Sequence, residues 1–321
     1  MDLIYTNVNR DDVGILKSYT FDLAYGTDEN DFELTLDLNE HCCDADCILY
    51  IEGTEYGGII DTISVVTDEE KLIYRGRTWQ GIFGSKVIVP DEGNAYLTVS
   101  GEANAVIGNL IERLGLSDLF VASKDKSGLT ISNYSFGRFV DGYSGIIKML
   151  DTVSGKLKFT FADGQVTVSA LPIVDYSNDE QFDNDSVEME IEKTHNPVNH
   201  LICLGKGELT ERQVIHLYMD GNKNISKTRT FSNLQEVTAV FDYPNAESLD
   251  ELEKKGTEKF QEIVPQDKVQ LNFSPEEASY DIGDIIGARE LITNTLVGVK
   301  ITKKIVNISY GETNIQYKAG E

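Results

Sequence analysis

The sequence predicts a mainly β protein with an α+β insert: two related small antiparallel β-barrels, an α+β domain and a small helical insertion. Three observations support this class. Apolar and polar residues alternate along many short runs, which is the period of a half-buried strand. Two stretches in between carry apolar residues at helical spacing instead. The strand-rich regions at the two ends of the chain share a faint common pattern, which indicates an internal repeat.

The first barrel is expected over residues 1–92. Apolar residues alternate with polar ones over residues 32–38, and residues 48–51, 58–66 and 72–78 continue the pattern. Glycine pairs and short acidic turns separate these runs. Strands that follow one another this closely predict an antiparallel sheet or small barrel.

The α+β domain is expected over residues 93–185. The segments SGEANAVIGNLIERLG and GYSGIIKMLDTVSG carry apolar residues three and four positions apart, and each ends at a glycine that suits a helix stop. The segment KLKFTFADGQVTVSAL then reads as a β-hairpin that turns at Asp163-Gly164. With 321 residues, 40% of them apolar, the chain is long enough for two or three such cores.

The second barrel is expected over residues 186–222 and 268–321, with an insertion over residues 223–267. Ser248, with Glu251 three positions later, has the pattern of a capping box, so a helix is expected to begin there inside the insertion. Strand patterns fill the chain from about residue 269 to its end.

The internal repeat links the two strand regions. DCILYI from Asp46 resembles DIIGAR from Asp284, and Gly58-Ile59 resembles Gly298-Val299. Two further blocks keep the same spacing in both copies: Ile63-x-Val65 with Leu72-x-Tyr74-Arg75, and Val306-x-Ile308 with Ile315-x-Tyr317-Lys318. Chance agreement between two apolar strand pairs is common, so the repeat is an interpretation that the strand pairings must test.

Three cysteines and a histidine lie close together in EHCCDADCIL, which raises the alternatives of a metal site, a redox site or ordinary strand residues. A structural zinc site usually draws on two separated ligand pairs, whereas Cys42 and Cys43 are adjacent and no second pair follows. In the repeat, Cys47 falls where Ile285 falls, at an apolar strand position. Buried cysteine behaves as a small hydrophobe, so structural cysteines are expected here, as at Cys203.

Other signals of chemistry are weak. HExxH, GxSxG and phosphate-loop motifs are missing, and GKGELT at Gly205 lacks the upstream glycine of a phosphate loop. His195 and His200 are more consistent with a turn before a strand than with a metal pair. Trp79 is expected in the core rather than as a platform for a sugar. The sequence therefore predicts no catalytic, cofactor-binding or metal-binding residue.

The charge is strongly acidic, with a formal net charge of −26 and a pI near 4.4. This argues against nucleic-acid binding, because phosphate contacts need clustered Lys and Arg. A solvated acidic surface explains the charge; the alternative is a wall that lets a polyanion pass without holding it. The first residues show no signal peptide, and no apolar run approaches the roughly 20 residues of a membrane span.

Several separated segments together resemble the tail-hub, or tail-tip, family of siphophages and prophages of Gram-positive bacteria. They occur in order and cover nearly the whole chain. The segments are YGGIIDTISV with YRGRTWQGIF, SGEANAVIGNLIERLGL, GYSGIIKMLDTVSGKL, EKTHNPVNHLICLGKGELTERQVIHLYMDG and YDIGDIIGARE. That family is similar in fold to the baseplate hub of contractile tails and to the spike base of type VI secretion.

The resemblance implies a homotrimer at the tail tip of a virion, synthesised in the cytoplasm of the bacterial host. Each subunit would give two tube-type β-barrels, so that a ring of six barrels matches the sixfold tube to threefold tip components. Its implied partners are a distal tail or tube protein, a tape-measure protein and tip fibre or spike proteins, with DNA passing through the lumen. We expect acidic and small polar residues to face that lumen, and the cluster of Lys300, Lys303 and Lys304 to point away from it, toward a neighbouring subunit or ring.

Two other functions stay open at this point: a tail-associated peptidoglycan hydrolase or endopeptidase, and a carbohydrate-binding receptor adhesin. Many tail-tip proteins carry such modules in a C-terminal extension, whereas this sequence stops at Glu321, soon after the second barrel. Hydrolase activity is therefore not carried over from the resemblance. We expect a structural protein without catalysis of its own.

Overall fold

The computed structural model describes residues 1–178, 181–183, 187–192, 197–221, 223–264, 268–275, 279–292 and 295–320. The chain divides into two compact units: unit 1 is Met1–Glu190 with Val269–Glu321, and unit 2 is Ile191–Lys268. Strands predominate over helices, so the mainly β class with an α+β insert is confirmed. No helix in the described part of the chain is long and apolar enough to cross a membrane.

The strands are β1 (Leu3–Thr6), β2 (Asp12–Leu16), β3 (Thr20–Gly26), β4 (Asp31–Asp37), β5 (Ile48–Tyr50), β6 (Gly57–Val66), β7 (Lys71–Thr78), β8 (Thr98–Glu102), β9 (Phe120–Ala122), β10 (Thr130–Ser135), β11 (Gly155–Ala162), β12 (Gln165–Pro172), β13 (Gln181–Asp183), β14 (Glu188–Glu192), β15 (His200–Leu204), β16 (Val214–Met219), β17 (Ile225–Ser226), β18 (Thr238–Asp242), β19 (Lys268–Phe273), β20 (Ile285–Glu290), β21 (Thr295–Ser309) and β22 (Glu312–Ala319). The α-helices are α1 (Trp79–Gly84), α2 (Ala103–Arg113), α3 (Gly142–Asp151) and α4 (Leu249–Ile263).

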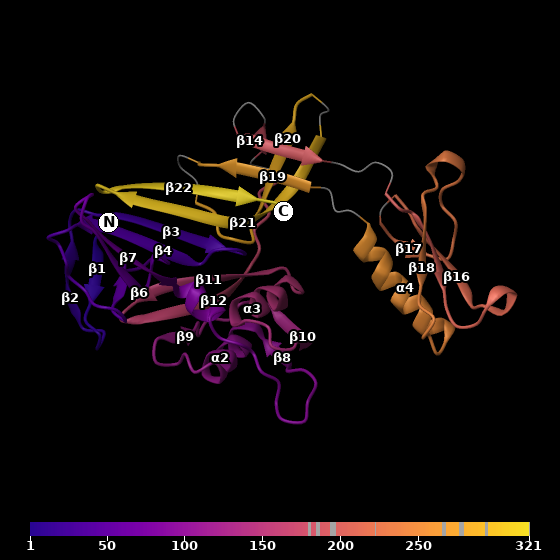
Figure 1. Cartoon of the computed structure of the whole chain (residues 1–321), viewed down its shortest axis with the longest axis horizontal. Coiled ribbons are helices and arrows are strands. Elements are labelled where there is room, and N and C mark those ends of the chain that lie inside the picture. The colour runs from indigo at the N-terminus through magenta and orange to yellow at the C-terminus, as the bar shows by residue number, and fades with distance from the viewer. Residues whose placement is uncertain are drawn as a thin grey trace. The chain divides into compact units, whose positions relative to one another are not determined.

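The main sheet of unit 1 joins both ends of the chain. Its order is β14-β19-β22-β21-β3-β4-β7-β6-β5-β1-β2, with β20 paired to β21 and β13 paired to β20. Figure 1 shows β21 and β22 from the C-terminal region running beside β3 and β4 from the N-terminal region. The two strand regions are therefore parts of one continuous sheet, and the closure of each region into a barrel stays a prediction.

The sheet contains the same five-strand arrangement twice. We call β3, β4, β5, β6 and β7 module 1, and β14, β19, β20, β21 and β22 module 2. In both modules the spatial order is first, second, fifth, fourth and third strand along the chain. The long fourth strands carry a bulge at the same place, between Ile60 and Thr62 in β6 and between Ile301 and Lys303 in β21. The repeat is thus a real duplication of topology.

The pairings correct the register of the repeat. Tyr74 corresponds to Tyr317, as the sequence indicated, because Arg75 and Lys318 both pair with the residue just after the bulge. Counting from the bulge, however, Val306 corresponds to Val65 rather than to Ile63. Apolar residues that alternate with polar ones match equally well when one strand is shifted by two residues, so the sequence pattern alone does not fix the register. The bulge, which adds a residue to the strand, does fix it.

The position of Cys47 is corrected in the same way. The bulge residues Ile60 and Ile301 each exchange backbone hydrogen bonds with the chain just before the short third strand: the N–H of Ile60 donates to the carbonyl of Cys47, and the N–H of Ile301 donates to that of Asp284. Cys47 therefore corresponds to Asp284, and not to Ile285 as the comparison of the two sequence segments indicated.

The α+β domain packs two helices on a small sheet. β11 and β12 form the expected hairpin, β9 joins β12 in parallel, and β8 pairs with β10. Helices α2 and α3 lie on one side of this hairpin (Figure 1). Their apolar faces share a core with α1 of the preceding region, where Trp79 stacks on Phe161 at 5.4 Å between ring centroids. A common core makes module 1 and the α+β domain one packed body.

Unit 2 is a four-stranded sheet, ordered β17-β16-β15-β18, with α4 packed on it. The sequence placed residues 200–219 in the second barrel, whereas β15 pairs here with β16 and, in parallel, with β18. The inserted unit therefore spans Ile191–Lys268 rather than residues 223–267. The reason is packing: Cys203 lies against Gly256 of α4, where a Cβ atom would come within 2.5 Å of the Cys203 sulfur.

Candidate functional site

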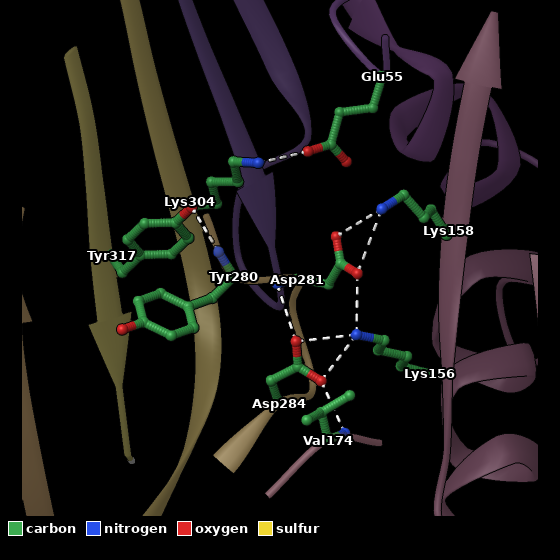
Figure 2. A network of polar contacts seen from close by, with 9 residues as sticks. All are labelled: Glu55, Lys156, Lys158, Val174, Tyr280, Asp281, Asp284, Lys304 and Tyr317. Atoms are coloured by element: carbon green, nitrogen blue, oxygen red, sulfur yellow. Dashed lines mark hydrogen bonds and ion pairs between the residues drawn. The ribbon is translucent and has the colours of Figure 1, made fainter. Parts of the chain in front are cut away.

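A buried ionic network lies where module 2 meets the α+β domain. It consists of Lys156 and Lys158 on β11 with Asp281 and Asp284, which precede β20. The Nζ atom of Lys156 lies 2.7 and 2.8 Å from the two carboxylate oxygens of Asp284 and 2.8 Å from Asp281. Lys158 reaches Asp281 at 3.1 Å from the opposite side (Figure 2). We call these four residues the ionic network.

Asp284 is the centre of this network. Its residue is 1% exposed, and its carboxylate also accepts hydrogen bonds from the backbone N–H of Val174 at 2.9 Å and of Asp281 at 3.0 Å. Gly283 beside it has a φ of +100°, and a Cβ atom there would lie 3.1 Å from the Cβ of Lys156. The glycine therefore provides both the turn and the space that bring Asp284 to Lys156.

A second buried ion pair joins module 2 to module 1. Lys304 on β21 contacts Glu55 at 2.6 Å, and its Nζ atom lies 5.5 Å from the ring centre of Tyr56 and 5.8 Å from that of Tyr317. The hydroxyl of Tyr317 in turn accepts a hydrogen bond from the backbone N–H of Tyr280 at 3.0 Å (Figure 2). Separating the two modules would leave the buried Lys304 without its partner Glu55, so this pair opposes their separation.

The pKa values in the ionic network follow from burial and pairing. Burial opposes the charge of Asp281, but Lys156 and Lys158 outweigh it and hold the pKa of that carboxyl below its usual value. Burial also opposes the charge of Lys156, yet Asp281 and Asp284 outweigh it and raise the pKa of the ammonium group. For Lys304, burial is outweighed by Glu55, Tyr56 and Tyr317, and the pKa is again raised. Pairing therefore favours the charged form of each group.

Acid should remove the contribution of Asp281 to stability. Its pKa is lowered on folding, so the contribution is complete above the unfolded value of about 3.9 and is lost as the pH falls through the folded value. Asp281→Asn is expected to lower the urea midpoint of unit 1 at pH 7, and this difference from the wild type should shrink below about pH 4. Lys156 loses its contribution only above about pH 10.4, since its pKa is raised. A difference that persists unchanged at pH 2.5 would contradict the assignment.

The three lysines that were expected to point together, toward a neighbouring subunit or ring, instead separate along β21. Lys300 pairs with Asp151 of α3, and Lys303 pairs with Glu29 on the opposite face of the sheet. Lys304 is 3% exposed and points inside the molecule. The expectation is therefore wrong for Lys304, because strand alternation and the bulge direct adjacent residues to different faces. For Lys300 and Lys303 the direction relative to a lumen stays a prediction.

The cysteine cluster belongs to the core of module 1. Cys43 and Cys47 are buried among apolar side chains, and the sulfurs of Cys42 and Cys43 lie 3.1 Å apart. His41 contacts the hydroxyl of Tyr74 at 2.9 Å. Cys203 is buried in the core of unit 2. Within the described ranges, no three histidine, cysteine or acidic side chains are placed to hold a metal ion.

Protein purified without a chelator is expected to contain less than about one tenth of a zinc ion per chain, because a structural site would need four ligands. Elemental analysis by mass spectrometry checks this, with the Cys42→Ser, Cys43→Ser double variant as the matched control. Stoichiometric zinc in the wild type that disappears in the variant would overturn the structural interpretation of the cysteines.

The remaining residues singled out by sequence are distributed over both units. Trp79 is fully buried, as expected. Gly205 directly follows β15, and its N–H donates to the carbonyl of Gln213 at 2.8 Å, so GKGELT lies in the connection between β15 and β16. His200 is buried and bonds Glu236 at 2.7 Å and His216 at 2.8 Å. His195 lies outside the described residues, so the pairing of His195 with His200 is not tested.

A groove of about 510 Å³ lies on the face of the main sheet opposite the core of module 1. Its rim is rich in paired charges: Arg75 contacts Glu33 and Arg77 contacts Asp61, both at 2.7 Å. Most of the charged residues that line this groove are acidic, namely Asp22, Glu29, Asp31, Glu33 and Asp61. We call this surface the acidic groove. Side chains at alternate positions of β3, β4, β7 and β6 form it because the other positions face the core.

Sequence reasoning missed the ionic network and the acidic groove. Lys156 and Lys158 alternate with Leu157 and Phe159 on β11, which indicates an ordinary half-exposed strand. The pair DIGD around Gly283 offered a weak signal, since two acids flanking a glycine suit a tight turn. Asp284 in this turn is 128 positions from Lys156 in the sequence, and no local pattern indicates that the two residues are in contact in the fold.

The fold and its site together define a class of protein: a duplicated strand module with an α+β domain locked against it by buried ion pairs. No protein-family model matches the chain, and no curated protein sequence matches it. Solved structures do share the fold. The prophage tail protein gp18 from Listeria monocytogenes EGD-e aligns with a TM-score of 0.57 and 11% identity, over 100% of this chain and 94% of that protein.

Two further solved structures show the same likeness. The 43 kDa tail protein of prophage MuSo2 from Shewanella oneidensis has a TM-score of 0.55 and 8% identity, over 99% of this chain and 98% of that one. The tail protein from Neisseria meningitidis MC58 has a TM-score of 0.52 and 12% identity, over 100% and 96% of the two chains. The chain therefore has the fold of these tail proteins over its full length.

Proposed function

We propose that the protein is a structural tail component of a phage or phage-like particle, and that it acts as the hub at the tail tip. The observation that carries this proposal is the likeness of fold to tail proteins over the whole chain, which includes both strand modules and both insertions. Such a protein positions its neighbours in the tail and catalyses no reaction. The buried ion pairs support this role because they hold the α+β domain and the two modules of unit 1 in one fixed arrangement.

The proposed assembly is a homotrimer. Each chain has two modules of the same topology, so three chains place six similar modules around an axis. Such a ring can contact a sixfold tube on one side and threefold tip components on the other. The proposed neighbours are a distal tail or tube protein, a tape-measure protein and fibre or spike proteins. A Gram-positive host and a position at the very tip of the virion belong to the same proposal.

The charge suits a ring that DNA passes without being held. A trimer carries three times −26, which is −78 formal charges. Basic walls release counterions on phosphate contact and so bind DNA, whereas acidic walls do not. We place the acidic groove toward the lumen, because its acids outnumber its bases and the bases present are paired. No observation favours a hydrolase or an adhesin over this structural role.

The assembled protein is expected to contain three copies. Three times 35.7 kDa is about 107 kDa, which mass photometry or light scattering can distinguish from one copy or six. Electron microscopy of the purified particle gives the same count in place, and is the decisive measurement because hub rings can require neighbouring proteins to close. One copy or six copies around the tail axis would contradict the proposal.

A further inference from the structure

We propose that the adjacent thiols of Cys42 and Cys43 form a redox site, which a small-molecule disulfide such as oxidised glutathione converts into a disulfide between the two residues. This chemistry belongs to one loop of a single chain, so it does not depend on the proposed role in a tail. The sequence raised a redox site as an alternative to structural cysteines, and the structure adds the geometry that the spacing did not give. We call Cys42 and Cys43 the dithiol.

The two sulfur atoms of the dithiol face each other. They lie 3.1 Å apart, which is only about 1 Å more than the length of a disulfide bond, about 2.05 Å. Small rotations of the two side chains would bring the sulfurs to bonding distance. The structure therefore places the thiols in position to react with one another.

The loop that carries the dithiol can adjust to such a bond. Strand β4 ends at Asp37 and β5 begins at Ile48, so both cysteines lie between strands. The backbone N–H of Cys42 donates a hydrogen bond to the hydroxyl of Tyr74 at 3.2 Å, and not to a neighbouring strand. Closing the ring turns the peptide between the two cysteines, and no strand pairing has to break for this.

The two thiols differ in access and in reactivity. Cys42 is half-buried beside the exposed His41, whereas Cys43 is 4% exposed. The hydrogen bond from Cys43 lowers the pKa of the Cys42 thiol, and Tyr74 acts in the same direction against the effect of burial. The same contact and burial raise the pKa of Cys43. Since the thiolate is the nucleophile, Cys42 is the thiol that attacks an oxidant.

The reaction proceeds in two exchange steps. The thiolate of Cys42 attacks one sulfur of the small disulfide; a bond forms between these sulfurs, the bond within the small disulfide breaks, and one thiolate leaves. Cys43 then loses its proton and attacks the sulfur of Cys42, which releases the second thiolate. Both leaving thiolates take up a proton. Two electrons thus pass from the dithiol to the small disulfide, which departs as two thiols.

The product should be easily reduced. A trans peptide holds adjacent Cα atoms about 3.8 Å apart, below the range of about 4.4–6.8 Å found in most disulfides. A disulfide between adjacent residues is therefore strained, and strained disulfides belong to the labile, reversible kind. Excess reduced glutathione should open it again. In the proposed tail role, the dithiol would stay reduced during synthesis in the cytoplasm and close after release.

Peptide mapping of the full chain tests the site. The protein is treated with oxidised glutathione, remaining thiols are alkylated, and the unreduced chain is cleaved before its aspartates. This cleavage separates residues 37–43, which hold the dithiol, from residues 46–60, which hold Cys47. Peptide 37–43 is expected to lose two hydrogens, about 2 Da, to carry no alkyl group and to stay unlinked. After excess reduced glutathione it should carry two alkyl groups.

Two variants and one internal control make the result specific. Cys43→Ser should retain glutathione as a mixed disulfide at Cys42, because the attacking thiol remains and the second is gone. Cys47→Ser should form the disulfide as the wild type does. Cys203 is fully buried, and burial raises the pKa of its thiol to about 11. It should therefore react at least about tenfold more slowly than the dithiol.

Three outcomes would overturn the redox site: a wild-type peptide 37–43 that keeps both alkyl groups, a link from this peptide to Cys47, or oxidation of Cys203 at the same rate. The wild-type map gives this answer even if a variant fails to fold. The number of copies in the tail is measured separately, so the redox site and the proposed function can fail independently of each other.

Discussion

Lys156→Met is expected to lower the free energy of unfolding of unit 1 by about 3–5 kcal/mol, because removing one partner of a buried ion pair leaves the other charge uncompensated. The side chain of Lys156 is 5% exposed, and both Asp281 and Asp284 depend on it. Urea denaturation followed by fluorescence reports on this unit alone, since the single tryptophan, Trp79, lies in its core.

The control for this prediction is Lys71→Met. Lys71 pairs with Glu69 at 2.6 Å, but both side chains are about half exposed, and exposed pairs contribute little to stability. The double variant Lys156→Met, Asp284→Asn should recover part of the loss, since it removes the unpaired charge as well. Equal effects of Lys156→Met and Lys71→Met would show that the ionic network does not hold unit 1 together.

Trp79→Ala is expected to cost about 3–5 kcal/mol, the range for large aromatic residues removed from a core. Trp79 is fully buried, stacks on Phe161 and meets Phe120 edge to face at 6.4 Å. Gly57 is part of the same fit, since a Cβ atom there would lie 2.5 Å from the indole. Circular dichroism in urea measures the change without relying on tryptophan.

Two variants make this result specific. Trp79→Phe should cost less than Trp79→Ala, because it keeps the ring packing and removes an indole N–H that has no partner within the described residues. Tyr96→Ala, at a residue 56% exposed, should change stability by less than about 0.5 kcal/mol. A tryptophan that served as a sugar platform would show the reverse: little loss of stability and a loss of glycan binding on an array.

Local patterns predicted the local structure well. The hairpin that turns at Asp163-Gly164 is present as β11 and β12, and Ser248 caps α4 by accepting a hydrogen bond from the N–H of Glu251 at 3.2 Å. These features depend on residues close in sequence, where turn chemistry and capping act directly. The α+β domain was recognisable for the same reason.

Long-range features were not predictable in this way. The register of the repeat was misplaced because a period of two is unchanged by a shift of two residues, and the bulges that fix it leave no clear mark in the sequence. The boundary was expected at residue 222 because β15 and β16 show the same apolar alternation as the strands of a barrel. In the structure β15 instead pairs with β18 and packs on α4, so both strands belong to unit 2. The ionic network depends on where two distant segments meet.

The pairing of β3 with β21 also sets an order of events during synthesis. Thr20 and Ser309, which meet at this junction, are 289 positions apart. A ribosome adding about 5–20 residues per second needs roughly 15–60 s to make the chain between them. Until β21 is made, the β3 edge of module 1 stays open, because the strand that covers it belongs to the C-terminal region. Contacts this distant in sequence close late, because chain entropy opposes them until both strands exist. The nascent chain is therefore most exposed to pairing with another copy before its last strands emerge, and a slow stretch of translation after β19 would lengthen that exposure.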